Sequence, residues 1–332
     1  MVLTLLLVFF ISLASIFVLL KQASNLKLIA LPGGHRQHLQ PTPLVGGLGI
    51  CFAILVGVFL LDSSSYQILP SLVVLCALGA LDDRYSLHAV VRFIAQGAAA
   101  FLMICLTGVK LNTLGFLFSQ QELLLGGWAT SVTVFACIGV INAVNMSDGL
   151  DGLAGSFTLL ILLCLCVLGS PDRVLILIAC ASVSGFLFWN IRIKRLQARV
   201  FMGDSGSTML GLLVAYLMIN YSQEKQGLWP VTALWIVALP LIDAVTVMIV
   251  RPLRGRSPFS ADRIHYHHQL RDAGLSVSQT LLVALALQLA LICLGVTLWW
   301  ANVVGYVQFY CFLGVFFSYM MFLLWKTKPR QA

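Results

Sequence analysis

The chain has 332 residues, of which 60% are apolar and only 10% are charged, and its formal net charge is +8. Because an average soluble domain has about 25% charged residues, this composition excludes a soluble globular enzyme, a disordered tail and a nucleic-acid-binding domain. An integral membrane protein remains, and an excess of Lys and Arg is typical of its cytoplasmic loops rather than of a nucleic-acid partner.

Eleven apolar segments follow one another along the chain, and most approach the roughly 20 residues that a helix needs to cross the hydrocarbon layer. Lipid offers no partners for backbone amides and carbonyls, so we expect all-α structure in a single integral membrane domain, 1–332. The expected transmembrane helices are 2–20, 44–61, 68–81, 88–107, 128–144, 153–169, 174–191, 207–221, 229–250, 279–299 and 303–325. The connection 108–127 alternates loosely at its start, which predicts a short hairpin.

The distribution of cations predicts the orientation of these helices. No cation precedes the first span and Lys21 follows it, which places the N-terminus outside. When Arg92 is counted with the second inside loop, alternation from there places 17 of the 20 Lys and Arg residues inside and leaves Lys110, Arg173 and Lys225 outside. The C-terminus is then cytoplasmic, and the predicted catalytic cytoplasmic loops are 21–43, 82–87, 145–152, 192–206 and 251–278.

Eight of the twelve acidic residues fall in or next to these cytoplasmic loops. The preference for positive charge on this side concerns Lys and Arg and does not explain the position of the acids. The eight are Asp82, Asp83, Asp148, Asp151, Asp204, Asp243, Asp262 and Asp272. Carboxylates that gather on a cation-rich face predict a site that holds a metal ion and handles phosphate.

Two of the acidic motifs stand at the ends of predicted spans. The adjacent carboxylates of Asp82 and Asp83 repel each other unless a cation relieves them, although a solvated turn is an alternative interpretation. Asp204, within Phe201–Ser207, either caps the following helix or belongs to a helix N-terminus that attracts an anion.

The stretch between the fifth and sixth spans combines two amides with two acids. Asp148 and Asp151 are three residues apart, so a helical turn would place both on one face. A helix cap explains one aspartate, but it does not explain why Asn142 and Asn145 stand beside the two acids. The stretch is therefore a second candidate for the site.

Asp243 lies inside a predicted span, roughly 10 Å from its inner end at about 1.5 Å per residue. An ionisable side chain at that depth is a functional candidate by default. Pairing with an arginine such as Arg251 is an equally suitable interpretation.

The largest inside loop, 251–278, carries several arginines and then the run from His265 to His268. On a helix His265 and His268 would share a face and His267 would point elsewhere. Zinc ligation is one interpretation, but no Cys is near and the arginines disfavour a cation. Binding of a diphosphate by Arg and His donors fits better, and a solvated basic loop is the remaining alternative.

The first inside loop contains a rigid turn. Its prolines and glycines surround Thr42 and lead into the second span. Arg36 and His38 flank this turn, and Thr42 and His38 are candidates to contact a substrate.

Four motifs in this order resemble the polyprenyl-phosphate N-acetylhexosamine-1-phosphate transferases. They are the pair Asp82-Asp83, NAVNMSDGLDGLAG from Asn142, FMGDSGS around Asp204 and HYHH from His265. The resemblance covers about residues 32 to 272 and is consistent with eleven spans. The segment SPFSADRIHYHH is more similar to the WecA branch of the family than to the MraY branch.

The resemblance implies transfer of GlcNAc 1-phosphate from UDP-GlcNAc to undecaprenyl phosphate, with release of UMP. It implies Mg²⁺ or Mn²⁺ as cofactor and an active site on the cytoplasmic side of the bacterial inner membrane. The expected partners are both substrates and the lipid bilayer, without nucleic acid, and a homodimer is compatible with this function. The product would begin a lipid-linked envelope glycan such as an O-antigen. The alternatives are the same chemistry with UDP-GalNAc, UDP-QuiNAc or UDP-FucNAc, or a cation-coupled transporter, which would place its acids near the bilayer midplane.

The resulting hypothesis gives each motif a role. Asp204 with Asp83 would hold the metal, and Asp82 would orient the lipid phosphate or accept its proton. Asp148 and Asp151 would bind the nucleotide or orient the metal. Arg251, His265, His267 and His268 would hold the donor diphosphate, and Asn142, Asn145, Thr42 and His38 complete the expected substrate-binding set. The five catalytic aspartates should then converge in one shallow pocket.

Overall fold

The computed structural model describes residues 1–31, 40–61, 64–192, 197–258 and 263–326. These residues form a helical bundle, with one sheet of two short antiparallel strands, β1 (Ile29–Ala30) and β2 (Thr42–Pro43). Within the described part of the chain, seven helices are long and apolar enough to cross a membrane, or up to eight when a bent pair is counted as one span. The prediction of an all-α integral membrane protein is therefore confirmed, whereas eleven crossings remain a proposal.

Each predicted span corresponds to one helix or, in one case, to a bent pair, with ends that differ by a few residues. The helices are α1 (Val2–Leu26), α2 (Gly46–Leu60), η1 (Ser64–Ile68), α3 (Leu69–Tyr85), α4 (Ala89–Thr107), η2 (Gly126–Trp128), α5 (Ala129–Met146), α6 (Leu153–Val167), α7 (Arg173–Asn190), α8 (Gly203–Ser222), α9 (Pro230–Ile236), α10 (Ala238–Val250), η3 (Pro252–Arg254), α11 (Tyr266–Asp272), α12 (Val277–Trp300) and α13 (Gly305–Lys326). Asp82 and Asp83 therefore lie in the last turn of α3, and Asp204 lies in the first turn of α8, rather than in the loops predicted for them.

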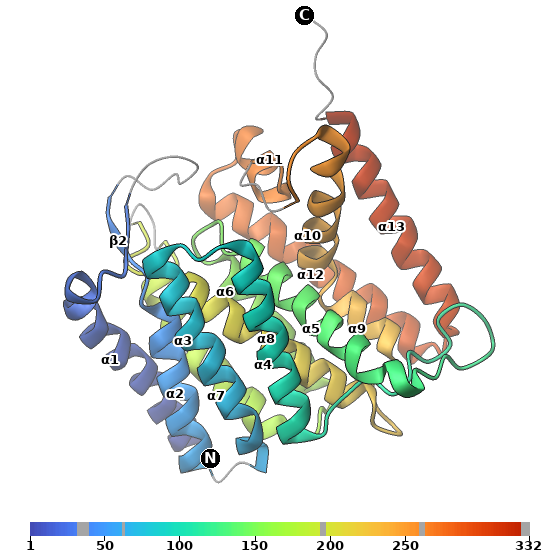
Figure 1. The fold of residues 1–332 in the computed structure, drawn as a ribbon, viewed down its shortest axis with the longest axis horizontal. Coiled ribbons are helices and arrows are strands. Elements are labelled where there is room, and N and C mark those ends of the chain that lie inside the picture. The colour runs from blue at the N-terminus through green and yellow to red at the C-terminus, as the bar shows by residue number, and fades with distance from the viewer. Residues whose placement is uncertain (32–39, 62–63, 193–196, 259–262, 327–332) are drawn as a thin grey trace, which may run out of the picture.

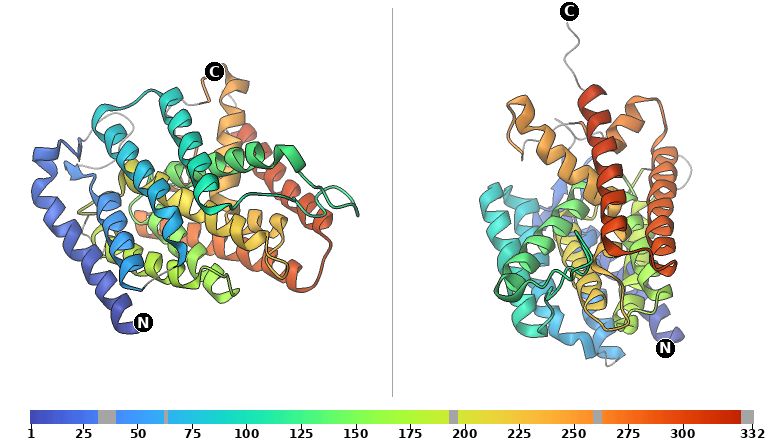
Figure 2. Two further views of the ribbon diagram at one scale, coloured as in Figure 1. Left: turned by 60° about the horizontal axis from the view of Figure 1, so that its bottom comes forward. Right: turned by 90° about the vertical axis from the view of Figure 1, so that its right-hand side faces the viewer.

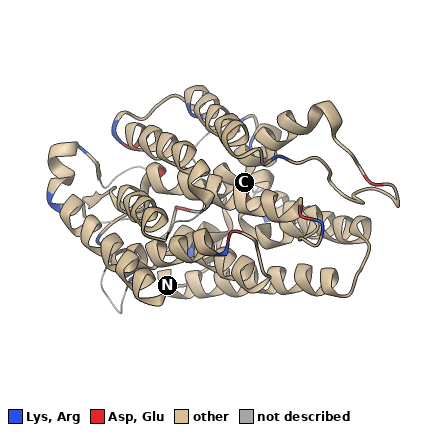
Figure 3. Cartoon of the chain, turned by 90° about the horizontal axis from the view of Figure 1, so that it is seen from below, with Lys and Arg blue, Asp and Glu red and all other residues tan. Residues whose placement is uncertain are grey.

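The first helix begins and the last helix ends on opposite sides of the bundle. Figure 1 shows that α1 begins at the bottom and α13 ends at the top, the side that also carries β2 and α11. The views in Figure 2 agree with this arrangement. Figure 3 shows that the charged residues lie mostly in loops and at helix ends, while the bodies of the helices are apolar. An odd number of crossings would place the two ends in this way.

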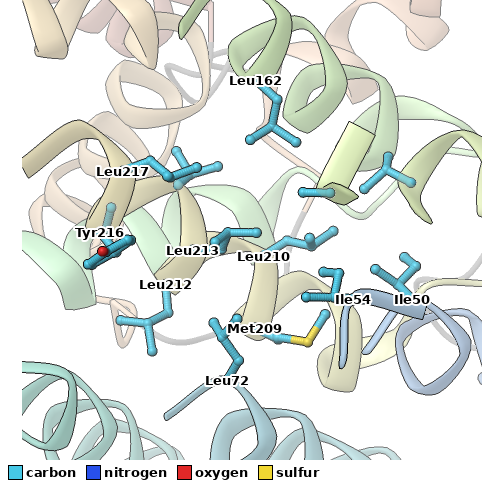
Figure 4. Close-up of a cluster of buried hydrophobic side chains, with 14 of the residues drawn as sticks. Ile50, Ile54, Leu72, Leu162, Met209, Leu210, Leu212, Leu213, Tyr216 and Leu217 are labelled. Atoms are coloured by element: carbon cyan, nitrogen blue, oxygen red, sulfur yellow. The ribbon is translucent and has the colours of Figure 1, made fainter. Parts of the chain in front are cut away.

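The centre of the bundle is α8, whose residues are almost all buried. Its side chains pack against α2, α3, α5 and α6. In Figure 4, Met209 and Leu213 lie among Ile54 of α2, Leu72 of α3 and Leu162 of α6. A helix that is apolar on all sides is buried by its neighbours, so the N-terminal end of α8 is enclosed by the ends of the surrounding helices.

Two glycines allow neighbouring helices to approach the start of α8 closely. A Cβ atom on Gly47 of α2 would lie 2.1 Å from the backbone nitrogen of Gly206. A Cβ atom on Gly79 of α3 would lie 2.4 Å from the carbonyl oxygen of Asp204. Only glycine fits at these contacts, because real Cβ atoms do not approach other atoms so closely. Gly79 lies about one turn before Asp82, so its contact sets the distance between Asp82 and Asp204.

The prediction of one continuous helix over 229–250 is wrong. The segment forms α9 and α10, which meet at an angle of 86°. Gln288 of α12 stabilises the break, because its Nε2 donates to the carbonyl oxygen of Ile236 (2.6 Å) and its Oε1 accepts from the amide of Leu239 (2.9 Å). Pro240, in the first turn of α10, has no N–H that would need a partner. The bend is tolerated because a buried side chain replaces the interrupted backbone hydrogen bonds.

The connection 108–127 forms the short hairpin that its alternation predicts. Thr113 and Leu124 form an antiparallel bridge. Gln223, directly after α8, accepts hydrogen bonds from the amides of Asn112 (2.9 Å) and Thr113 (3.2 Å). The hairpin is therefore attached to the end of α8 opposite the acidic cluster.

Candidate functional site

Two cavities adjoin at the N-terminal end of α8. The first has a volume of about 270 Å³, and its polar lining consists of Asp82, Arg92, Gln96, Asn142, Asn145, Asp204, Thr208, Arg251 and His265. The second has a volume of about 390 Å³, and its polar lining consists of Asp83, Asn145, Asp148, Asp151, Asn190, Arg192, Asp204, His268 and Arg271. Asn145 and Asp204 belong to both. The structure thus brings the five predicted aspartates together, in two adjoining cavities rather than in one pocket.

Asp83 binds the N-terminus of α8. Its Oδ1 accepts the N–H of Asp204 (2.9 Å) and its Oδ2 accepts the N–H of Ser205 (3.2 Å). The first amides of a helix have no partner within the helix and favour a negative charge. Gly203, with φ of 73°, leaves room for this contact, since a Cβ atom there would lie 2.5 Å from Oδ2 of Asp83. The cap expected from Asp204 is therefore supplied by Asp83 of another helix.

Asp204 lies between the two cavities and contacts Asn145 and Asp82. Its Oδ1 accepts a hydrogen bond from Nδ2 of Asn145 (2.8 Å). Its carboxyl group also interacts with that of Asp82, which in turn accepts the amide of Leu87 (2.7 Å) and is paired with Arg92 (3.4 Å). Two facing carboxyl groups repel when both are ionised, so a proton or a cation is favoured between them.

Asp148 and Asp151 line the second cavity in different environments. Burial raises the pKa of Asp148 well above its ordinary value, and the nearby carboxylates of Asp204 and Asp83 raise it further. Asp151 instead forms an ion pair with Arg192. The ion pair of Asp151 with Arg192 links the turn before α6 to the segment after α7.

The first loop forms part of the wall beside this site. The amide of Phe201 donates to the carbonyl oxygen of Pro43 (2.8 Å), and the amide of Gly46 donates to the carbonyl oxygen of Phe201 (3.0 Å). The hydroxyl of Thr42 donates to the carbonyl oxygen of Gln40 (3.1 Å), which shapes the turn. His38 lies outside the described residues, so its predicted role stays a prediction.

Two amide side chains of the site were not identified from the sequence. Gln96 of α4 accepts a hydrogen bond from Asn142 (2.7 Å) in the first cavity. Asn190, at the end of α7, accepts from the amide of Gly152 (2.7 Å) and donates to the carbonyl oxygen of Val200 (2.8 Å). Both interrupt apolar runs, and polar residues in such runs are the signal that would have found them.

Asp243 forms an ion pair with His265, whose Nδ1 lies 2.7 Å from its Oδ2. The sequence also offers an arginine such as Arg251 as an alternative partner. His265 is the N-cap of α11, with ψ of 150°, and its ring lies near that of His268, with centroids 6.3 Å apart. The prediction that His267 points elsewhere is wrong, because its ring stacks on that of His265, with centroids 5.5 Å apart and an interplanar angle of 8°.

His267 and His268 are neutral at physiological pH. Burial lowers the pKa of His267 to about 3 and that of His268 to about 4. His267 is 1% exposed and neither ring nitrogen has a hydrogen-bond partner within the described residues. Its Nε2 lies against Gly149, where a Cβ atom would be only 2.7 Å away. Each ring can therefore offer one N–H donor but carries no charge.

The acidic cluster matches the requirements of Mg²⁺ or Mn²⁺ better than those of zinc. Among the described residues, no three or more His, Cys, Asp or Glu side chains are arranged to hold a metal. Zinc usually takes four ligands of the nitrogen and sulfur type, whereas Mg²⁺ takes one or two carboxylates and completes its shell with water and phosphate oxygens. Asp204 with Asp82 and Asp83 beside it supplies such carboxylates. The residues present therefore fit a divalent cation that is bound together with a phosphate substrate.

A third cavity, of about 570 Å³, is almost entirely apolar and lies among α5, α8, α9 and α10. At one end it is lined by Leu111 and Leu114, next to the hairpin. At the other end it shares Phe93, Asn142 and Met248 with the first cavity. An apolar groove therefore leads to the acidic cluster.

The sequence of the chain is similar to those of known proteins. The model of glycosyl transferase family 4 matches residues 65–222. An undecaprenyl-phosphate alpha-N-acetylglucosaminyl 1-phosphate transferase of Escherichia coli (strain K12) is 34% identical over 311 residues, which cover 90% of this chain and 84% of that protein. The protein of the same name from Salmonella typhi is 34% identical, with coverage of 92% and 86%. A probable undecaprenyl-phosphate N-acetylglucosaminyl 1-phosphate transferase of Bacillus subtilis (strain 168) is 34% identical, with coverage of 76% and 72%.

Proposed function

The chain belongs to glycosyl transferase family 4, and from this premise we propose that it transfers GlcNAc 1-phosphate from UDP-GlcNAc to undecaprenyl phosphate and releases UMP. The proposal includes eleven crossings of the bacterial inner membrane, an outer N-terminus, a cytoplasmic C-terminus and an active site that faces the cytoplasm. The observation that carries it is the succession of three cavities, of which the apolar one shares Asn142 with the mixed one, and the mixed one shares Asp204 with the polar one.

The apolar cavity suits the acceptor lipid. A polyprenyl chain has no polar groups beyond its phosphate, so its binding site should be apolar along its length and charged at one end. The third cavity has this character, and it meets the first cavity at Asn142 and Met248. The acceptor phosphate would then lie beside Arg92 and Arg251, which supply charged hydrogen-bond donors, with His265 next to Arg251.

The polar second cavity suits the nucleotide donor. Arg192, Arg271 and His268 supply donors for phosphate oxygens, and Asp148 and Asp151 lie on the facing wall. Of the four residues expected to hold the donor diphosphate, only His268 lines this cavity, while Arg251 and His265 line the first. We propose that Arg251 and His265 meet the phosphates from the acceptor side.

The proposed reaction takes place at the junction of these two cavities. An oxygen of the acceptor phosphate forms a bond to the β-phosphorus of the donor, and the bond from that phosphorus to the bridging oxygen breaks, so that UMP leaves with the electron pair. A phosphate monoester is largely dianionic at neutral pH, since its second pKa is about 6, and Asp82 therefore serves mainly to orient it. The cationic side chains hold both negatively charged substrates together, which makes positioning the main contribution of the protein.

The metal would be held by Asp204 together with Asp83, with Asp82 beside them. When bound, Mg²⁺ or Mn²⁺ would reduce the repulsion between the two phosphate groups and stabilise the charge on the departing UMP. Asn145 orients the Asp204 carboxylate through its hydrogen bond. Asp83 fixes the start of α8, and so the place of Asp204, through two backbone amides.

The proposal is tested with purified protein in detergent, radiolabelled UDP-GlcNAc, undecaprenyl phosphate and Mg²⁺. The wild type should transfer label to the lipid and release UMP, and Asp204→Asn should lose nearly all turnover. The matched control is Asp272→Asn, because Asp272 is exposed, pairs with Arg263 at the surface and lines neither cavity. Substantial turnover by a folded Asp204→Asn would remove Asp204 from its role. A panel with UDP-GalNAc, UDP-QuiNAc and UDP-FucNAc identifies the sugar, and a wild type without UMP release would refute the enzymatic function.

A further inference from the structure

A buried carboxylate stands directly behind the first cavity. Asp243 of α10 is 3% exposed. Its Oδ2 accepts a hydrogen bond from Nδ1 of His265 (2.7 Å), and its Oδ1 accepts from the amide of Tyr266 (3.1 Å) and from the hydroxyl of Tyr319. Tyr319 belongs to α13, so three separate elements meet at this carboxylate. A charged group that is buried so completely needs such partners.

These contacts determine which nitrogen of the His265 ring is directed to the cavity. A carboxylate can only accept, so Nδ1 of His265 must carry the proton that it shares with Asp243. The opposite nitrogen, Nε2, is then directed to the guanidinium of Arg251, whose Nη2 lies 3.5 Å away. His265 and Arg251 both line the first cavity. The ring therefore reaches the cavity with a defined tautomer and orientation.

We propose that Asp243 and Tyr319 are positioning residues, which hold His265 with Nδ1 protonated, so that Nε2 accepts from Nη2 of Arg251 and orients this guanidinium towards a phosphate group of the substrates. The proposal rests on the function proposed above, in which the first cavity receives the acceptor phosphate. Neither residue lies within 65–222, the region matched by the family model. Through Tyr319, the helix α13 thereby takes part in the site.

The division of the hydrogen bonds explains why both residues are needed. Oδ1 of Asp243 receives the tyrosine hydroxyl and the Tyr266 amide, which leaves Oδ2 to His265. Without the hydroxyl, the carboxylate is free to rotate towards the remaining donors. Without the negative charge, His265 can adopt the other tautomer, and an asparagine amide would then donate to Nδ1 instead of accepting from it.

The kinetic test is a double-mutant cycle. Asp243→Asn should lower kcat/KM about 10- to 100-fold, as is usual when the group that orients a functional histidine is removed, and Tyr319→Phe should lower it by a smaller factor. In a His265→Ala background neither change should cause a further loss, because both act through His265. The matched control is Tyr310→Phe on the same helix, whose exposed hydroxyl only contacts the carbonyl oxygen of Phe118. This control should retain wild-type turnover.

A second measurement does not depend on catalysis. In protein labelled with ¹⁵N-histidine, the resonance that disappears in His265→Ala should have the chemical shifts of a ring protonated at Nδ1, and Asp243→Asn should change them. The positioning role would be overturned if wild-type His265 carried its proton on Nε2 alone. It would also be overturned if Asp243→Asn and Tyr319→Phe lowered kcat/KM in the His265→Ala background as much as they do in the wild type. A wild type that shows this tautomer but transfers no sugar phosphate would instead refute the proposed function.

Discussion

Replacement of Gly79 by alanine tests whether the contact between α3 and α8 sets the geometry of the acidic cluster. The new Cβ atom would lie 2.4 Å from the carbonyl oxygen of Asp204, whereas ordinary contact begins at 3.4 Å. The two helices would therefore have to separate by about 1 Å, which moves Asp82 and Asp83 away from Asp204. A displacement of this size in a catalytic site costs about 100-fold in rate, so we expect kcat to fall by about that factor.

The assay compares Gly79→Ala with Gly97→Ala, a second glycine in the interior of a helix. A Cβ atom on Gly97 would have its nearest neighbour 3.7 Å away, in ordinary contact. Both variants gain the same helix propensity, about 1 kcal/mol, so a difference between them reports the close contact. Transfer of radiolabelled sugar phosphate gives kcat, and thermal unfolding in detergent shows whether each variant is folded. Equal turnover by the two folded variants would refute the reasoning.

Three further predictions follow from single contacts. Gln288→Leu should lower the free energy of unfolding by about 2–4 kcal/mol, because a carbonyl and an amide at the α9–α10 bend lose their partners, and a change below about 1 kcal/mol in denaturation would contradict this. Burial lowers the pKa of His267 from its ordinary 6.5 to about 3, so its neutral ring contributes full stability above about pH 6.5, and this contribution is lost as the pH falls towards 3. His267→Phe should therefore lose less thermal stability than the wild type between pH 6.5 and pH 4. Equal losses in the two proteins would be inconsistent with this pKa. Arg192→Met should raise the KM for UDP-GlcNAc about tenfold, since Asp151 loses its charge-assisted partner, with Arg192→Lys in between; unchanged KM values would exclude a role of this ion pair in donor binding.

The predictions for the helices depended on local properties of the chain. Apolar length alone identifies a helix in lipid, because backbone groups must find partners within the helix, and each predicted segment is helical in the structure. The bend between α9 and α10 escaped this reasoning. It depends on Gln288, about fifty positions along the chain, whose side chain replaces the interrupted hydrogen bonds.

The acidic motifs also predicted which residues gather at the candidate site, but not the contacts that they make there. Adjacent carboxylates repel each other, so a motif such as Asp82-Asp83 indicates a special site even when the partners of the two residues are unknown. Their partners come from distant segments: Asp83 binds the amides at the start of α8, Asp151 pairs with Arg192, and Asp243 orients His265. The sequence by itself therefore determined a helical membrane protein with acids gathered on one side. Only the tertiary structure decided which carboxylate caps a helix, which one faces another acid and which one holds a histidine, because hydrogen bonds act over about 3 Å and packing alone brings these groups within that distance.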